Sequence, residues 1–161
     1  MRIRIDLPGL PRGKGRGRAV STPNGARVYT DAKTRSYEAQ LKTFAVQAMR
    51  GRLPTALPVR LVMTAFLPVP ESWSKRKRAE ALAGIIWPLT KPDVDNYLKC
   101  CDALNAIVWN DDKQIVNACV MKVYAERPGL TIEITELGAS ASHGVAKTAL
   151  AGATEPYLAL E

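Results

Sequence analysis

Hydrophobic and polar positions alternate along the first segment of the chain, residues 2–7. A period of two places successive side chains on opposite faces of a strand, so this segment predicts a strand with one face on the core. Residues 59–67 carry apolar side chains on both faces, which is typical of a central strand. Residues 114–124 and 130–135 predict two more strands, joined across the turn-forming residues 127–129.

Helical spacing appears in three further segments. Within residues 33–50, apolar side chains recur every three or four positions, and Gly51 follows as a stop signal. Residues 71–84 predict a short helix whose first turn is strongly basic. Residues 96–104 contain neither Gly nor Pro and follow Asp95, a favoured N-cap residue, so a helix is expected to begin there.

This order of strands and helices predicts an α/β (α+β) fold, with a mixed β-sheet covered by helices. A length of 161 residues suits a single domain, which we place at residues 1–136. Residues 137–161 are rich in Ala, Ser, Gly and Thr, so a flexible tail is expected there. No apolar run approaches the roughly 18 residues of a membrane span, and no signal-peptide pattern opens the chain. We therefore expect a cytoplasmic protein with no membrane partner.

Positive charge is concentrated in the first third of the chain. Through residue 52, twelve Lys and Arg stand against three acidic residues, while the whole chain has a formal charge of +8. Between residues 9 and 18, Lys14, Arg16 and Arg18 alternate with glycines, which lets side chains and backbone amides approach phosphates together. The alternative is a solvated charged loop. The basic residues 75–78 are as compatible with a solvated face as with a second DNA contact.

Acidic residues gather in one short segment of this basic chain, residues 91–112. It holds five of the fifteen carboxylates, namely Asp93, Asp95, Asp102, Asp111 and Asp112. Like charges at this density repel, and a hard divalent cation such as Mg²⁺ would offset them and bridge to phosphate. Pro92 keeps the preceding residue extended, so Asp93 and Asp95 are expected to point to one side of an extended run. The segment predicts phosphodiester hydrolysis.

Two neighbouring groups complete the expected site. Residues 109–112 are expected to form a turn before a strand, which would place Asp111 or Asp112 at the start of that strand. Lys99 lies one helical turn beyond Asp95 and could supply positive charge to the reacting phosphate. Carboxylates from two elements could hold one or two metals. Taken singly, these residues could equally be helix caps, an ion pair and a turn, and only their clustering in a basic chain indicates catalysis.

Histidine and cysteine offer little other chemistry. His143 is the only histidine and lies in the tail, so histidine-based metal sites and Ser-His-Asp catalysis have no basis. Cys100, Cys101 and Cys119 are odd in number and lack zinc-site spacing, which favours reduced thiols packed as small hydrophobes. No small-molecule cofactor is expected.

Three motifs carry a family resemblance. They are Lys91-Pro-Asp-Val-Asp-Asn-Tyr-Leu-Lys99, Asp102-Ala-Leu-Asn105 and Trp109-Asn-Asp-Asp-Lys-Gln-Ile115. Together they resemble the signature of RusA-type Holliday junction resolvases, small homodimeric Mg²⁺-dependent endonucleases often carried by phages and prophages. Residues 8–18 and 28–38 resemble that family's opening, so the similarity covers most of residues 1–136.

The resemblance implies roles for particular residues. Asp93, Asp95 and Asp112 match the metal-binding catalytic aspartates, and Lys99 matches the catalytic lysine. The implied metal is Mg²⁺, with Mn²⁺ as the alternative. In one departure from the family, two residues rather than three separate Lys99 from Asp102, which on an α-helix rotates the later residues by about 100°.

We therefore expect a Mg²⁺-dependent, structure-selective DNA endonuclease that resolves four-way junctions in recombination and repair. A two-fold substrate with two cut positions favours a homodimer acting on branched DNA. The alternatives are a non-catalytic basic nucleic-acid-binding module and an RNA-directed metal nuclease, because phosphate dominates the affinity for both DNA and RNA. The candidate DNA-binding residues are Lys14, Arg16, Arg18, Arg27, Lys33, Arg35, Lys75 and Arg76.

Overall fold

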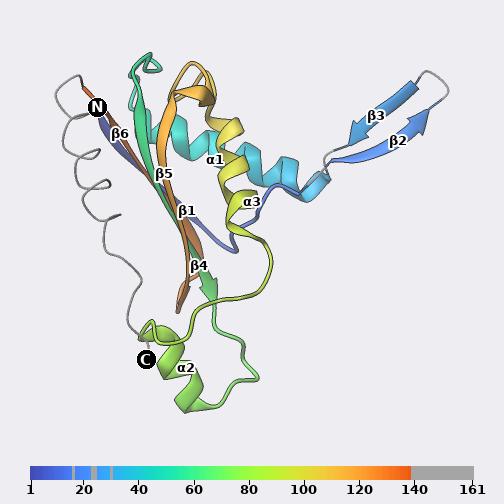
Figure 1. Cartoon of the computed structure of the whole chain (residues 1–161), viewed down its shortest axis with the longest axis vertical. Helices are drawn as coiled ribbons and strands as arrows, with labels where there is room; N and C mark the ends of the chain where they lie inside the picture. Colours follow the sequence, from blue (N-terminus) through green and yellow to red (C-terminus); the bar gives the residue numbers. More distant parts are fainter. Residues whose placement is uncertain (16, 23–24, 30, 139–161) are drawn as a thin grey trace, which may run out of the picture.

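The computed structural model describes residues 1–138 except 16, 23–24 and 30 (Figure 1). Its main sheet has the order β1-β6-β4-β5, in which β4 pairs with β5 in parallel and the other pairs are antiparallel. The strands are β1 (Arg2–Pro8), β4 (Val59–Pro68), β5 (Ile115–Ala125) and β6 (Gly129–Glu136). This mixed sheet, covered by helices, confirms the predicted fold class.

Alternating side chains build the core on one face of the sheet. Every second residue of β1 is buried, as are Leu130, Ile132 and Ile134 of β6. In β4 one face is fully buried and the other is half-buried, as expected for a strand with neighbours on both sides. The alternation read from the sequence therefore predicted which side chains form the core.

Helix α1 (Ala32–Met49) packs its apolar face on this core. The side chain of Asp31 caps its start by accepting a hydrogen bond from the Thr34 backbone N–H at 3.0 Å. The helix ends at Arg50, which adopts a left-handed conformation (φ 51°) just before Gly51. The predicted boundaries, residues 33–50, agree to within one residue.

The order of the strands in the sheet differs from their order along the chain. Strands β5 and β6 follow each other in sequence, yet β4 lies between them in the sheet. Strand β4 is hydrogen-bonded on both edges, to β5 and to β6, and the short connection at residues 126–128 links β5 to β6 across its end. The parallel pair β4/β5 requires a long crossover, and that crossover carries the remaining helices.

Two elements lie away from the main body. Helix α2 (Lys75–Leu82) begins at the Ser74 cap, falls within the predicted residues 71–84 and buries only Ala81. Strands β2 (Arg18–Thr22) and β3 (Gly25–Tyr29) pair as a separate hairpin that projects as an arm from the opposite end (Figure 1). Thr22 pairs with Gly25 across the hairpin, and residues 23 and 24 between them lie outside the described residues.

The expected flexible tail, residues 137–161, lies outside the described residues from position 139 onward. Within the part of the chain that the structure describes, no helix combines the length and apolar character needed to cross a bilayer.

Candidate active site

The acidic segment begins as a helix earlier than the sequence indicated. Asp93 is the N-cap residue of α3 (Val94–Leu98), with extended backbone (φ −75°, ψ 159°), and Asp95 lies in the first helical turn. The expectation that the two carboxylates share one side of an extended run is therefore wrong. Asp is favoured at N-caps, and here the first of the two aspartates takes that position. At about 100° per helical residue, their side chains then diverge.

Lys122 of β5 connects the residues just before α3 to the main sheet by hydrogen bonds. Its ammonium donates hydrogen bonds to the carbonyl oxygens of Thr90 (2.8 Å) and Pro92 (3.2 Å). The two carbonyls immediately precede α3, so this contact fixes where the helix begins. A lysine within a strand pattern gave no sign of this role in the sequence.

The segment continues from α3 into a 3-10 helix, η1 (Lys99–Leu104). Each residue of a 3-10 helix advances by about 120°, compared with about 100° in an α-helix. The rotation between Lys99 and Asp102 therefore differs from that expected for a continuous α-helix. Beyond η1, the buried Trp109 donates from Nε1 to Asn105 Oδ1 at 2.7 Å, which fixes the return of the chain toward β5.

The segment just before β5 gives the adjacent aspartates Asp111 and Asp112 different environments. Asp111 caps the short helix η2 (Asp112–Gln114), with its carboxylate accepting from the Lys113 N–H at 3.0 Å. This hydrogen bond is the main reason that the pKa of Asp111 lies below its ordinary value. Gln114 completes the capping box and also donates to the carbonyls of Thr55 and Leu57, each at 2.9 Å. Asp112 is left exposed.

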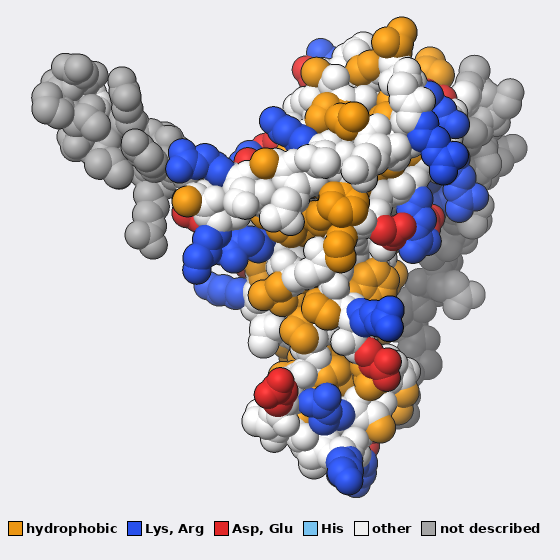
Figure 2. Space-filling view, turned by 180° about the vertical axis from the view of Figure 1, so that it is seen from behind, with side chains coloured by type: hydrophobic (Ala, Val, Ile, Leu, Met, Phe, Trp, Pro, Cys, Tyr) orange, Lys and Arg blue, Asp and Glu red, His pale blue; other side chains and the backbone are white. Residues whose placement is uncertain are grey.

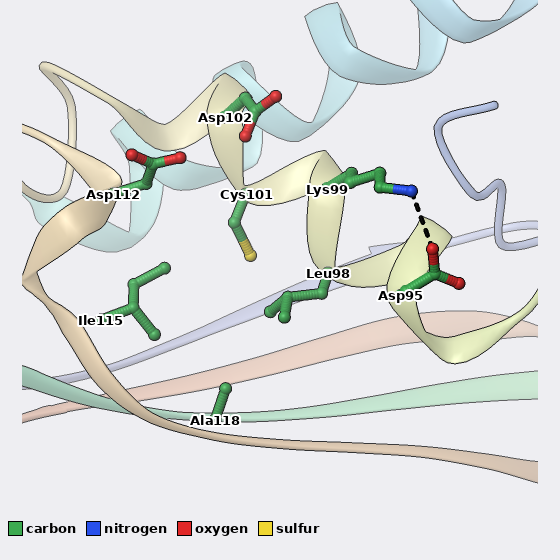
Figure 3. A pocket seen from close by; sticks show the side chains of 8 residues that line it. All are labelled: Asp95, Leu98, Lys99, Cys101, Asp102, Asp112, Ile115 and Ala118. Carbon is green, nitrogen blue, oxygen red and sulfur yellow. Dashed lines mark hydrogen bonds and ion pairs between the residues drawn. The ribbon is translucent and has the colours of Figure 1, made fainter. Parts of the chain in front are cut away.

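These elements surround a pocket of about 360 Å³ (Figure 3). Its lining residues are Asp95, Leu98, Lys99, Cys101, Asp102, Asp112, Ile115 and Ala118. The structure thus brings together three of the four predicted catalytic residues and adds Asp102. Asp93 and Asp111 are not among the lining residues.

The charges within the pocket form two groups (Figure 3). The ammonium of Lys99 lies 2.7 Å from Asp95 Oδ2, as expected for side chains four residues apart on a helix. This hydrogen bond lowers the pKa of Asp95, which therefore stays ionised to lower pH. The carboxylates of Asp102 and Asp112 lie on the other side of the pocket.

Lys14 lies in the glycine-rich loop between β1 and β2 and borders the side of the acidic pocket that holds Asp102. Its ammonium pairs with Glu38 of α1 at 3.0 Å and with Asp102 at 3.1 Å. Partial burial alone would lower the pKa of Lys14, but the hydrogen bonds to these two carboxylates raise it overall. Its backbone N–H also donates to the Asn96 carbonyl at 2.7 Å. Lys14 was predicted to contact DNA, whereas the structure places its charge between two carboxylates.

The other predicted DNA-binding residues fall in two regions. Arg18 and Arg27 lie in the hairpin arm, and Lys33 and Arg35 are exposed near the start of α1. Figure 2 shows Lys and Arg side chains gathered where the arm joins the body. Lys75 and Arg76 are exposed on α2, and Arg16 lies outside the described residues.

The three cysteines are free thiols. Cys100 and Cys101 are buried, as predicted, and burial raises the pKa of Cys100 to about 11. Both therefore remain protonated near neutral pH and pack as small hydrophobes. Cys119 is exposed on β5, where a buried position was expected.

The donor chemistry of the pocket fits a hard divalent cation. Its charged donors are carboxylate oxygens, which Mg²⁺ and Mn²⁺ favour. Among the described residues no three acidic or other ligating side chains already form a metal cluster. The side chains of Asp95 and Asp102 are 62% and 47% exposed, and each pairs with one lysine, so a change of side-chain rotamer would bring their free oxygens toward a shared cation.

Fold and site define the chain as a compact α+β domain with an acidic pocket that includes a lysine. Comparison with known families places it more narrowly, because the model for endodeoxyribonuclease RusA matches residues 8–135. The chain belongs to the RusA family of endodeoxyribonucleases, whose members are generally dependent on divalent metals. It is also 35% identical over 140 residues to the "Uncharacterized protein YqaN" of Bacillus subtilis (strain 168), covering 85% of this chain and 98% of that protein.

Proposed function

We propose that the protein is a Mg²⁺-dependent endonuclease that resolves four-way DNA junctions by paired phosphodiester hydrolysis. The observation that carries the proposal is the convergence of Asp95, Lys99 and Asp112 in one pocket of a chain that belongs to the RusA family. Exposed basic residues near the start of α1, such as Lys33 and Arg35, supply contacts to the DNA backbone.

Roles are assigned from the lining of the pocket and from the match to the family's motif. Asp95 and Asp112 line the pocket and hold the metal, with Asp102 as a further carboxylate beside them. Asp93 does not line the pocket, and its metal role rests on the family match alone. The metal, when bound, supplies an activated water and stabilises the departing oxygen. Lys99, held at the pocket by Asp95, presents positive charge to the crowded phosphate in the transition state. Asp111 serves the fold by capping η2.

A homodimer is part of the proposal. One chain offers one acidic pocket, and resolving a junction requires nicks in two opposed strands, so two copies related by a two-fold axis are the simplest arrangement. The connection between α2 and α3 carries strongly exposed apolar side chains, including Leu89 (94% exposed) and Ile85 (69%). Such a surface is typical of protein interfaces.

A cleavage assay tests the proposed function. Four-way junctions, linear duplexes and the corresponding RNA substrates are incubated with the protein, with and without Mg²⁺. We expect paired nicks in the junction only when Mg²⁺ is present, and little cutting of linear DNA. Binding without cleavage would instead support the non-catalytic module, and preferential cutting of RNA would support an RNA-directed nuclease.

A further inference from the structure

A second cavity, of about 440 Å³, lies between the loop after β1 and the start of α1. We name it the Arg12 pocket. It is lined by Pro8, Gly9, Leu10, Arg12, Ala32, Lys33, Ser36, Tyr37 and Gln40. None of these residues belongs to the acidic pocket.

The charged groups of the Arg12 pocket are all positive. Arg12 and Lys33 line it, no carboxylate does, and Ser36 and Gln40 add neutral hydrogen-bond donors. Within the described residues neither Arg12 nor Lys33 forms an ion pair within 4 Å. The nearby acid Asp31 is engaged by Thr34, whose hydrogen bonds are the main cause of its lowered pKa, with a smaller contribution from the charge of Arg12.

This composition selects a particular ligand. Two cations beside hydroxyl and amide donors suit an anion with several acceptor oxygens, and a backbone phosphate of DNA is the anion that the proposed function supplies. Lys14 shows the contrast on the same loop, because its ammonium is already paired with Glu38 and Asp102. Arg12 and Lys33 are available for a phosphate.

The Arg12 pocket is held at a fixed offset from the acidic pocket. The carbonyl of Arg12 accepts a hydrogen bond from Cys100 Sγ at 3.2 Å. The next residue, Gly13, packs so tightly against α3 and the residues before it that an added Cβ would lie 2.9 Å from Asn96 Cβ and 2.7 Å from Pro92 Cβ. Across the cavity, the buried Tyr37 is followed on α1 by Glu38, the partner of Lys14. The loop and α1 therefore connect the two pockets through direct contacts.

We propose that the Arg12 pocket binds one uncut phosphate of the DNA strand and thereby sets the register of the strand in the acidic pocket. This inference rests on the proposed function and adds a residue, Arg12, to the DNA-binding surface. A phosphate held there fixes how far along the strand the cut falls.

Phosphate scanning tests the proposal. Single methylphosphonates, which remove one backbone charge, are placed at successive positions of a junction, and binding is measured in the cleavage-inactive Asp112→Asn background. We expect one neutralised phosphate, offset from the cut position, to weaken binding about tenfold. In the additional presence of Arg12→Gln and Lys33→Gln that position should lose its sensitivity, and the log–log salt slope should fall by up to ~0.9 for each phosphate that the protein no longer neutralises.

Two variants control for charge and folding. Lys42→Gln removes one charge from an exposed site on the same helix, outside the pocket, and should leave the sensitive position unchanged. Lys33→Gln alone changes an exposed side chain, so its effect is separable from any unfolding caused by Arg12→Gln.

The outcomes separate this proposal from the proposed function. If the wild type cuts junctions but the double variant keeps the methylphosphonate sensitivity, or behaves like Lys42→Gln, the Arg12 pocket is not a phosphate site. If the wild type binds without cutting and the sensitivity is lost in the double variant, the pocket stands and the nuclease assignment fails. Absence of any DNA binding overturns both.

Discussion

At the scale of single residues, the pair formed by Lys99 and Asp95 matters for its place in the pocket more than for stability. Both side chains are about half exposed or more, so solvent screening leaves the pair little net stabilisation. Its importance lies in position, because it holds an ammonium at the pocket and keeps a carboxylate ionised.

Removing Lys99 should therefore change the titration of Asp95. With the hydrogen bond present, the folded-state pKa of Asp95 lies below its ordinary value of about 3.9, so the stabilisation is present above that value and is lost as pH falls through the folded-state pKa. We expect Lys99→Ala to raise the pKa of Asp95 toward the ordinary value, measured by carboxyl-carbon NMR titration. Lys113→Ala, beside Asp111, is the control, and an unchanged Asp95 titration in Lys99→Ala would contradict the described contact.

The sequence predicted some of these residues better than others. The pairing of Lys99 with Asp95 is a local helical relation, so spacing alone was enough to predict it. The N-cap positions of Asp93 and Asp111 depend on where each helix begins, and in both places the sequence offers a second aspartate close by. Of the two, only Asp111 makes a side-chain cap hydrogen bond. For Asp111, the start of η2 is set by Gln114, which completes the capping box and also donates hydrogen bonds to Thr55 and Leu57 in a distant loop.

At the scale of elements, the contact between the glycine-rich loop and α3 is the one that fixes the site. Gly13 lies against Pro92 and Asn96, where an added Cβ would approach other Cβ atoms at 2.7 and 2.9 Å. Gly15, two residues on, has nothing within 4 Å of such an atom. The two glycines thus make a matched pair.

We expect Gly13→Ala to destabilise the protein by about 1–3 kcal/mol, the usual cost of overpacking, as measured by chemical denaturation. Gly15→Ala should change stability by about 0.5 kcal/mol or less. Because both substitutions restrict the unfolded chain similarly, their difference isolates the clash. Equal stabilities for the two variants would show that the loop does not pack on α3 as described.

The elements themselves were largely predictable, whereas their arrangement was not. Strand and helix periodicities reflect which faces are buried, and the boundaries of β1, α1, β4 and β5 follow them closely. The position of β4 between β5 and β6 depends on pairing between strands far apart in sequence, which no local pattern records.

At the scale of the whole molecule, the distribution of charge indicates which surfaces face the DNA. Cations gather where the arm joins the body (Figure 2), and the acidic pocket lies at the side of α3 and η1. A single copy offers one such pocket, which makes assembly the main question at this scale.

Sedimentation at micromolar concentration should show a mass near twice 17.6 kDa. Mixing the wild type with Asp95→Asn should give heterodimers that nick one strand and leave the junction unresolved. A monomer that cuts both strands in one encounter would contradict the dimer.

The central claim, that the acidic pocket performs the cleavage, is tested most directly by comparing two adjacent aspartates. Asp112→Asn removes a carboxylate that lines the pocket, whereas Asp111→Asn makes the same chemical change at a helix cap, where Asn is as well accepted as Asp.

The measurement is the rate of junction nicking in Mg²⁺, with junction binding recorded alongside for both variants. We predict that Asp112→Asn binds the junction as well as the wild type or slightly better, because negative charge near phosphate is removed, yet does not cut it. Asp111→Asn should cut at close to the wild-type rate. Cleavage at the wild-type rate by Asp112→Asn, or loss of cleavage in Asp111→Asn alone, would place the reaction outside this pocket.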